Sequence, residues 1–250
     1  MKEEDILLKK RLLELSDKAY KNSMFYFTDF LSLPEISLFH ELKLPQSKYK
    51  IFGGNDNCER QIIRFGDAND LGYEIDFPIV MIKAEPLIQK FSDEFSHRDF
   101  LGAIMSLGIK REVIGDIILS ENIAYFFVIE KMKDYIIEQL TKVKHTHIRC
   151  CVYEDEVKEV EKNVENHEIL VSSLRIDGVI AKLFHLSRSQ AITMFQEKKV
   201  YLNSRVCENN SGLLKPEDVI AIRGYGKVVF KKELYETKKG RICVLIEKYI

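Results

Sequence analysis

The sequence predicts an α+β protein with several domains, and three observations support this class. Apolar residues recur at helical spacing in some segments and at every second position in others. A chain of 250 residues with 46% hydrophobic residues can bury more than one core. The net charge of −1 hides two opposite parts, because residues 172–250 hold 15 Lys and Arg against 8 Asp and Glu, whereas the first 171 residues hold 23 against 31. We therefore expect a separate basic C-terminal domain.

Four segments follow from composition and turn signals. They are an N-terminal α/β region at residues 1–71, a central small α+β sandwich at 72–152, an acidic connector at 153–170, and a C-terminal domain of two helices and a small antiparallel sheet at 171–250. The connector carries seven acids and two lysines between residues 153 and 168, with only a thin apolar stripe. This pattern predicts a partly helical, solvated segment, and a continuation of the central domain is the alternative.

The N-terminal region begins with leucines at helical spacing, which predict an amphipathic helix over residues 4–21. Pro34 marks the first position of a second helix, since proline lacks an amide hydrogen that a first turn would leave unbonded. A turn at Gly53-Gly54 lacks the Lys-Ser/Thr of a phosphate-binding loop, so we interpret it as part of a hairpin. The expected strands are 26–27, 48–52 and 61–65.

The central region has the order strand, helix, hairpin, helix, strand, which predicts a small layered sandwich. Ser96 and Gly108 supply the start and stop signals of its first helix. Such sandwiches often bind RNA on an open sheet face, although a fold alone does not establish a function. The expected strands are 79–84, 117–119, 124–129 and 146–152, and the expected helices are 97–107 and 131–141.

The C-terminal region shows two short helices followed by strands. Ser187 is the expected N-cap of the second helix, and Gln190 three residues later completes a capping box. Unpaired backbone amides and the positive helix dipole meet at Arg188 and Ser189, which makes this turn a natural phosphate site. The expected ranges are helices within 174–186 and 187–199, a strand and turn at 200–206, a strand at 219–222 and a glycine-relaxed corner at 223–227.

Four ordered blocks, LRID, SRSQA, KKVYLNSRV and KPEDVIAIRG, resemble the S-four RNA-binding domain, named for small-subunit ribosomal protein four. In that family the basic and polar residues of these blocks grip structured RNA. The resemblance, with Lys182 on the outer face of the first helix, implies an RNA-binding set. Its members are Arg175, Lys182, Ser187, Arg188, Ser189, Lys198, Lys199, Asn203, Arg205, Arg223 and Lys227.

The blocks FTDFLSLPE, KIFGGNDNCERQIIRFG and SHRDFLGAIMSLGIKREVIGDI resemble the YlmH family of bacterial proteins. This resemblance implies an RNA-binding central domain before an S-four domain. It also implies a ribosome-associated factor of translation, linked to quality control on the large ribosomal subunit, with structured rRNA and tRNA as partners. A secondary RNA-binding set flanks the first central helix, and local capping and pairing is the alternative for it. The set is His97, Arg98, Lys110 and Arg111.

No catalytic or cofactor motif is recognisable, and we expect a non-catalytic protein without cofactor or metal. His145 and His147, followed by Cys150 and Cys151, form the one cluster that resembles a metal site, although the adjacent cysteines of a strand point opposite ways. The five cysteines lack a CxxC pair, which favours reduced thiols. Short apolar runs and a charged start favour a soluble cytoplasmic protein that does not enter a membrane. We also expect a monomer.

Two other functional classes remain open from the sequence. The first is an rRNA- or tRNA-modifying enzyme, such as a pseudouridine synthase or methyltransferase, in which the S-four domain only delivers the active site. The second is a protein-binding adaptor that uses the acidic N-terminal part, for example at the division site.

Overall fold

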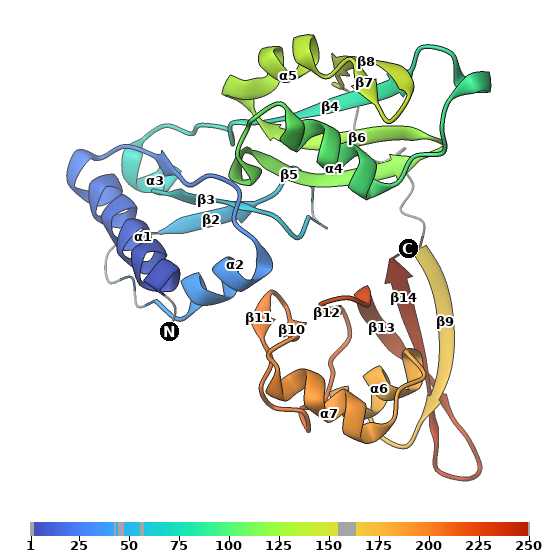
Figure 1. The fold of residues 1–250 in the computed structure, drawn as a ribbon. Coiled ribbons are helices and arrows are strands. Elements are labelled where there is room, and N and C mark those ends of the chain that lie inside the picture. Colours follow the sequence, from blue (N-terminus) through green and yellow to red (C-terminus); the bar gives the residue numbers. More distant parts are fainter. Residues whose placement is uncertain (1–2, 43, 45–47, 56–57, 155–163, 250) are drawn as a thin grey trace. The chain divides into compact units, whose positions relative to one another are not determined.

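The computed structural model describes residues 3–42, 44, 48–55, 58–154 and 164–249 and confirms the α+β class. The chain forms two compact units, Met1–Val160 and Glu161–Ile250, coloured blue to yellow-green and yellow to red in Figure 1. The N-terminal and central regions that the sequence separates at residue 72 both belong to the first unit. Their division into two domains stays a prediction.

The N-terminal part of the first unit is a three-stranded antiparallel sheet, order β1-β3-β2, packed against helices. Leu12 of the first helix and Ile36 and Phe39 of the second bury against Ile63 and Phe65 of the sheet. Pro34 is the second residue of the second helix rather than the first, because Ser32 is the N-cap. The elements are α1 (Glu3–Asn22), β1 (Tyr26–Phe27), α2 (Leu33–His40), β2 (Tyr49–Phe52), β3 (Ile62–Phe65) and α3 (Ala68–Leu71).

The central part is a five-stranded antiparallel sheet, order β5-β6-β4-β8-β7, with two helices on one face. Alternate residues such as Ile82 and Phe126 face Phe100 and Ile104 of α4 and Ile136 of α5. The elements are β4 (Ile79–Pro86), α4 (His97–Ser106), β5 (Ile114–Ser120), β6 (Ile123–Ile129), α5 (Lys133–Gln139), β7 (Lys142–Val143) and β8 (Thr146–Val152), with short 3-10 turns at Gln89–Phe91, Arg111–Val113 and Glu130–Met132.

The opposite face of the central sheet is partly covered by the N-terminal part. Met81 and Phe127, which alternate with the inward residues, pack in one cluster with Phe30, Cys58 and Ile62. The open sheet face on which such sandwiches often bind RNA is therefore covered here at Met81 of β4 and Phe127 of β6. The physical reason is that both faces of these strands carry large apolar side chains, and burying them removes apolar area from water.

A half-buried arginine, Arg60, joins the two parts of the first unit. The Arg60 guanidinium donates to the carbonyl oxygens of Phe30 at 2.9 Å, Ile114 at 2.9 Å and Arg111 at 3.3 Å. Burial lowers the pKa of Arg60 below its ordinary value. The Asp116 carboxylate accepts a hydrogen bond from the backbone amide of Arg60 at 3.1 Å. The positive charge of Arg60 therefore has an acidic neighbour.

The C-terminal unit is a six-stranded antiparallel sheet, order β11-β10-β12-β13-β14-β9, with both helices packed against one face. Val179 and Ile180 of α6 and Phe195 of α7 bury against Ile220 and Phe230 of the sheet. The elements are β9 (Val164–Val171), α6 (Ile176–Leu183), α7 (Arg188–Gln196), β10 (Val200–Leu202), β11 (Arg205–Val206), β12 (Asp218–Ile222), β13 (Gly226–Glu236) and β14 (Ile242–Tyr249).

The prediction of a partly helical, solvated connector at residues 153–170 is wrong for its C-terminal part. Residues 155–163 lie outside the described part of the chain, but residues 164–171 are strand β9, not helix or solvated linker. β9 pairs with β14 along its whole length, from Val171 opposite Ile242 to Val164 opposite Tyr249. The partner strand is remote in sequence, so the acidic composition alone gave no sign of this pairing.

Candidate nucleic-acid interface

The N-terminus of α7 has the capping box that the sequence predicts. The Ser187 hydroxyl accepts the Gln190 amide at 3.2 Å, and the Ser187 amide donates to Gln190 Oε1 at 2.8 Å. Ser189 Oγ lies 3.0 Å from Ser187 Oγ. Arg188, the first residue of α7, is exposed beside this turn. The arrangement offers a phosphate a cation, two hydroxyls and the positive end of a helix.

Arg175 lies at the N-cap of α6 and holds a buried carboxylate. Its Nε and Nη2 atoms donate to Asp177 at 3.1 and 2.6 Å, while Asn210 donates to the same carboxylate at 3.3 Å. The Arg175 guanidinium lowers the pKa of Asp177, and the charge of Arg188 contributes in the same direction. Arg175 and Arg188 therefore lie in the same electrostatic neighbourhood, although part of Arg175 is engaged within the protein.

Four predicted cations lie at or next to one end of the sheet. The Arg223 amide donates to the Lys199 carbonyl at 3.0 Å, and Lys227 pairs with Ala221 across the β12–β13 hairpin. Lys199 and its neighbour Lys198 form ion pairs with Glu197 and Glu208, both at 2.6 Å. All four of these side chains are at least 45% exposed, so water screens the pairs and a phosphate can compete for the lysines.

Asn203 has a structural role in the turn between β10 and β11. It adopts a left-handed backbone conformation with φ 49°, donates to Asp218 Oδ1 at 2.8 Å and accepts the Val219 amide at 2.9 Å. Both ends of its amide are thus engaged, which favours turn formation over RNA contact. Lys182 and Arg205 are exposed on α6 and β11. The RNA-binding roles of the whole set stay predictions.

Aromatic side chains accompany these cations, and the sequence analysis did not identify them. The rings of Phe184 and Tyr225 meet edge to face at 5.5 Å. Lys248 Nζ lies 5.7 Å from the centre of the Phe184 ring, and Lys227 Nζ lies 5.2 Å from that of Tyr249. The only available sequence signal was a tyrosine between two glycines in a basic corner, RGYGK.

The secondary set in the central part divides into two kinds of residue. Arg98 and Lys110 are exposed near the two ends of α4. Arg111, in contrast, is half-buried and donates to the carbonyls of Ile114 and Gly115 at 2.5 and 3.2 Å, and burial lowers its pKa to about 10. Loss of hydration and the nearby Arg111 charge also lower the pKa of His97. These contacts favour a structural role for Arg111.

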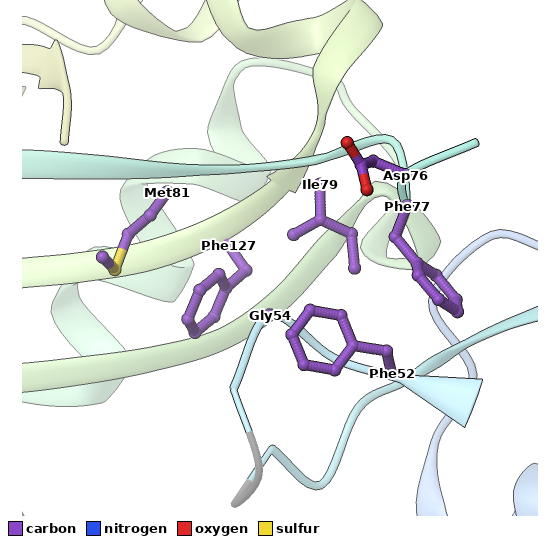
Figure 2. A pocket seen from close by; sticks show the side chains of 7 residues that line it. All are labelled: Phe52, Gly54, Asp76, Phe77, Ile79, Met81 and Phe127. Carbon is purple, nitrogen blue, oxygen red and sulfur yellow. The ribbon is translucent and has the colours of Figure 1, made fainter. Parts of the chain in front are cut away.

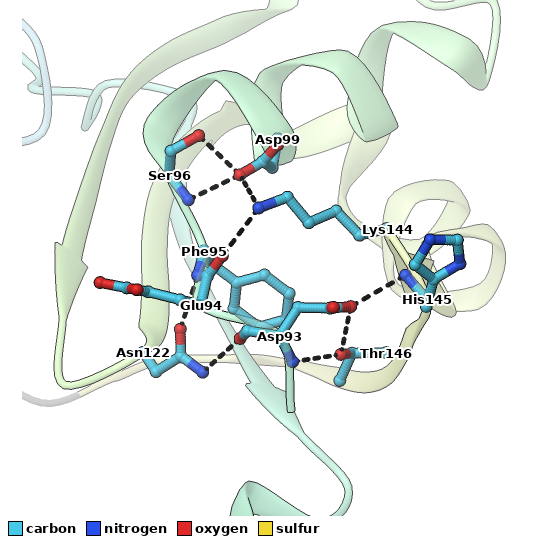
Figure 3. A network of polar contacts seen from close by, with 9 residues as sticks. All are labelled: Asp93, Glu94, Phe95, Ser96, Asp99, Asn122, Lys144, His145 and Thr146. Atoms are coloured by element: carbon cyan, nitrogen blue, oxygen red, sulfur yellow. Dashed lines mark hydrogen bonds and ion pairs between the residues drawn. The ribbon is translucent and has the colours of Figure 1, made fainter. Parts of the chain in front are cut away.

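The start of α4 is fixed by a polar network, shown in Figure 3. Asp99 accepts the Ser96 amide at 2.8 Å and forms an ion pair with Lys144 at 2.8 Å, which lowers its pKa to about 2. Asn122 and Thr146 bind the preceding loop through its backbone. The local capping that the sequence left as an alternative is therefore present at Asp99.

A cavity of about 350 Å³ lies in the first unit between the N-terminal hairpin and the central sheet. Figure 2 shows the rings of Phe52, Phe77 and Phe127 around it, with the Asp76 carboxylate at its edge. Asp76 is the one ionisable side chain among the seven lining residues, which also include Gly54, Ile79 and Met81. A cavity whose one ionisable side chain is an acid does not attract phosphate, and its lining side chains hold no pair of acid and base for catalysis.

Neither a metal site nor a membrane-spanning helix is found among the described residues. His145 lies in the turn before β8 and its amide donates to Asp93, while His147 is exposed on the strand. Cys150 is buried, which raises the pKa of its thiol to about 12, and Cys151 is exposed on the opposite face. The two histidines and two cysteines are therefore not brought together around one point.

Comparisons with known proteins agree with the resemblance seen in the sequence. Residues 73–157 match a family model described as "Putative RNA-binding domain in YlmH". Over 200 residues the chain is 29% identical to "Ribosome-associated protein quality control protein P2" of Bacillus subtilis (strain 168), covering 78% of this chain and 76% of that protein. A solved structure, "Cell division protein ylmH from Streptococcus pneumoniae", shares the fold with a TM-score of 0.51 at 16% identity, covering 62% of this chain and 93% of that chain. The chain is thus similar to YlmH proteins, and its residues 73–157 match the model of the RNA-binding domain described for them.

Proposed function

We propose that this protein binds structured RNA of the ribosome, with the C-terminal unit as its main RNA-binding module. The observation that carries the proposal is the exposed arginine Arg188 at a capped helix N-terminus, which together with Arg175 acts on Asp177. Residues 172–250 around it hold 15 Lys and Arg against 8 Asp and Glu. Support for the ribosome as the setting comes from the Bacillus relative, whose name describes a ribosome-associated quality control protein. We further propose that its targets are rRNA or tRNA on the large subunit, in the cytoplasm, and that the C-terminal unit is an S-four domain.

The physical basis is neutralisation of phosphates by side chains that surround a rigid core. Each phosphate contact releases condensed counterions, so affinity falls as salt rises. If about four to six cations contact phosphate, the log–log slope of affinity against salt is roughly −3 to −5. Recognition then depends on the shape of the RNA backbone, because side chains cannot enter the deep groove of an RNA helix to read bases.

The first unit contributes the second part of the proposal. It contains residues 73–157, the segment that matches a domain described as RNA-binding, and it exposes Arg98 and Lys110 at the two ends of α4. Its excess of acids makes it a poor general polyanion binder. We therefore assign it a secondary contact that orients the protein on the ribosome, while most of the affinity comes from the C-terminal unit.

The decisive experiment uses one charge reversal and a matched control. Arg188→Glu places an anion beside the helix N-terminus, where a phosphate would bind, so RNA affinity should fall by at least tenfold. Lys239→Glu makes the same change of charge at an exposed position in the β13–β14 hairpin of the same unit and should change affinity by about twofold or less. Fluorescence anisotropy with deproteinised ribosomal RNA measures both.

The outcomes separate the proposal from its alternatives. An equal loss of RNA affinity in both variants would indicate unspecific charge attraction. Wild-type RNA affinity of Arg188→Glu would refute the assignment of Arg188 to the RNA-binding site. Thermal unfolding must show that both variants are folded. A non-catalytic role also requires that rRNA and tRNA modification maps, obtained by mass spectrometry, are the same in a deletion strain. A lost modification would favour an enzyme.

A further inference from the structure

The turn between β12 and β13 presents an aromatic ring to solvent in an unusual setting. Tyr225 lies between Gly224 and Gly226, whose φ values of 89° and 100° are strained for other residues, and its amide donates to Ile222. The two glycines let the chain reverse tightly and lift the tyrosine out of the hairpin. Tyr225 remains 42% exposed, although it is a large aromatic residue.

Phe184 contacts this ring, and cations lie on the neighbouring residues of the same corner. Phe184 at the end of α6 contacts Tyr225 edge to face, so the ring is supported but not covered. Lys248 lies over the Phe184 ring, and Arg223 and Lys227 flank the same turn. No described acidic residue forms an ion pair with Arg223 or Lys248. A partly exposed ring that Phe184 supports and that has cations at neighbouring positions is thus present at one corner of the unit.

We propose that Tyr225 is a stacking platform for an unpaired nucleobase of the bound RNA, with Arg223 and Lys248 meeting the adjacent phosphates. This inference rests on the proposed function and adds to it a preference for RNA that contains a loop, bulge or single-stranded end. Exposed aromatic rings beside cations are the arrangement that binds single-stranded nucleic acid, because every base has a π-face and every linkage a phosphate. A protein partner would more readily complement this corner with acids, and the test includes that case.

Stacking makes a specific prediction for affinity. Replacing a stacking aromatic residue with alanine typically costs about 1–3 kcal/mol per base, which corresponds to roughly 5- to 150-fold in affinity. Tyr225→Ala should therefore weaken binding to an RNA hairpin with an unpaired loop by at least fivefold, and Tyr225→Phe should stay within about twofold. Tyr235→Ala is the matched control, since Tyr235 is 57% exposed in the same unit but lies near the C-terminal end of β13, away from the turn that holds Tyr225.

The salt dependence gives a readout that loss of charge would not mimic. Stacking releases no counterions, so Tyr225→Ala should keep the slope of the wild type while its affinity is lower at every salt concentration. A shallower slope in Tyr225→Ala would overturn the inference, because it would mean that the substitution removed phosphate contacts.

A fluorescent reporter tests stacking directly. The chain contains no tryptophan, so Tyr225→Trp introduces a single reporter at the proposed contact. Its emission should be quenched by RNA with an unpaired loop and much less by a fully paired duplex of the same length. Equal quenching by both RNAs, or no change with either, would overturn the inference. So would a change produced only by nuclease-treated ribosomal particles and not by deproteinised RNA, since that result indicates a protein contact.

Failure of this inference is distinguishable from failure of the proposed function. If Tyr225→Ala binds as the wild type does while Arg188→Glu loses affinity, the stacking platform is refuted and RNA binding stands. If Arg188→Glu retains full affinity, the proposed function fails first.

Discussion

Asp177 offers a direct test of what holds the candidate RNA-binding unit together. Its side chain is 4% exposed and accepts two hydrogen bonds from the Arg175 guanidinium, which is 39% exposed. Asp177→Asn keeps the shape of the side chain but removes its charge and places an NH₂ group among donors. The variant therefore removes the ion pair without making a cavity.

The expected loss of stability follows from this burial. Removing one partner of a buried ion pair costs about 3–5 kcal/mol, because the other charge stays buried without compensation. Here the guanidinium is partly exposed and regains water, so the free energy of unfolding should fall by less, about 2–3 kcal/mol. For a unit of this size 1 kcal/mol corresponds to about 4–8 °C, so the midpoint of unfolding should fall by roughly 10–20 °C.

The pH dependence has a definite sign. Arg175 lowers the pKa of Asp177 in the folded state, so the unfolded chain binds the proton more readily. The stabilisation is thus fully present above the unfolded pKa of about 3.9 and is lost as the pH falls through the lower folded pKa. The difference in stability between wild type and Asp177→Asn should be constant above about pH 5 and shrink in stronger acid.

Calorimetry of the full-length protein across this pH range measures both effects. Glu208→Gln is the control, because Glu208 forms an ion pair with Lys198 in which both side chains are 66% exposed, and it should change the stability of the same unit by less than about 0.5 kcal/mol. An unchanged midpoint for Asp177→Asn at pH 7, or a difference that grows in acid, would show that this pair does not stabilise the fold.

Three further predictions concern the first unit. Arg64→Ala should lower its free energy of unfolding by about 3 kcal/mol in urea titrations, because the 2%-exposed side chain lies between two aromatic rings. Gly54→Ala, at φ 110°, would place its Cβ 2.2 Å from the Phe127 ring of β6. It should lower the midpoint of thermal unfolding more than Gly108→Ala, at φ 77° with open space around it. Equal shifts of the midpoint in the two variants would contradict the steric argument. Iodoacetamide should label the exposed Cys151 and leave Cys150, with its pKa raised to about 12, unmodified, as peptide mass spectrometry can measure.

Features fixed by neighbouring residues could be predicted from the sequence. The capping box at Ser187 and the strand at residues 146–152 are confirmed with the expected limits, because a cap or an alternating strand depends on residues within a few positions. The two helices expected in the central part, at residues 97–107 and 131–141, are also present as α4 and α5, although α5 ends earlier than expected, at Gln139.

Features that depend on remote partners could not be predicted in this way. The sequence interpretation missed β9 and β14 and the bulged extension of β13, because a strand with polar residues is recognised only together with its partner. The same limit applies to the candidate site. Asn203 and Arg111 look like available polar groups in the sequence, but in the fold they bind Asp218 and the Ile114 carbonyl. The exposure of Tyr225 has only a weak local signature, its position between two glycines.

The pairing of β9 with β14 has a consequence for the nascent chain. During synthesis β9 is made well before β14. Until β14 is made, Ile169 and Val171 lack the strand with which they pair. An unprotected strand edge is an aggregation hazard during this interval. Glu165 and Glu168, exposed on the same strand, place negative charges along that edge and oppose premature association with other chains.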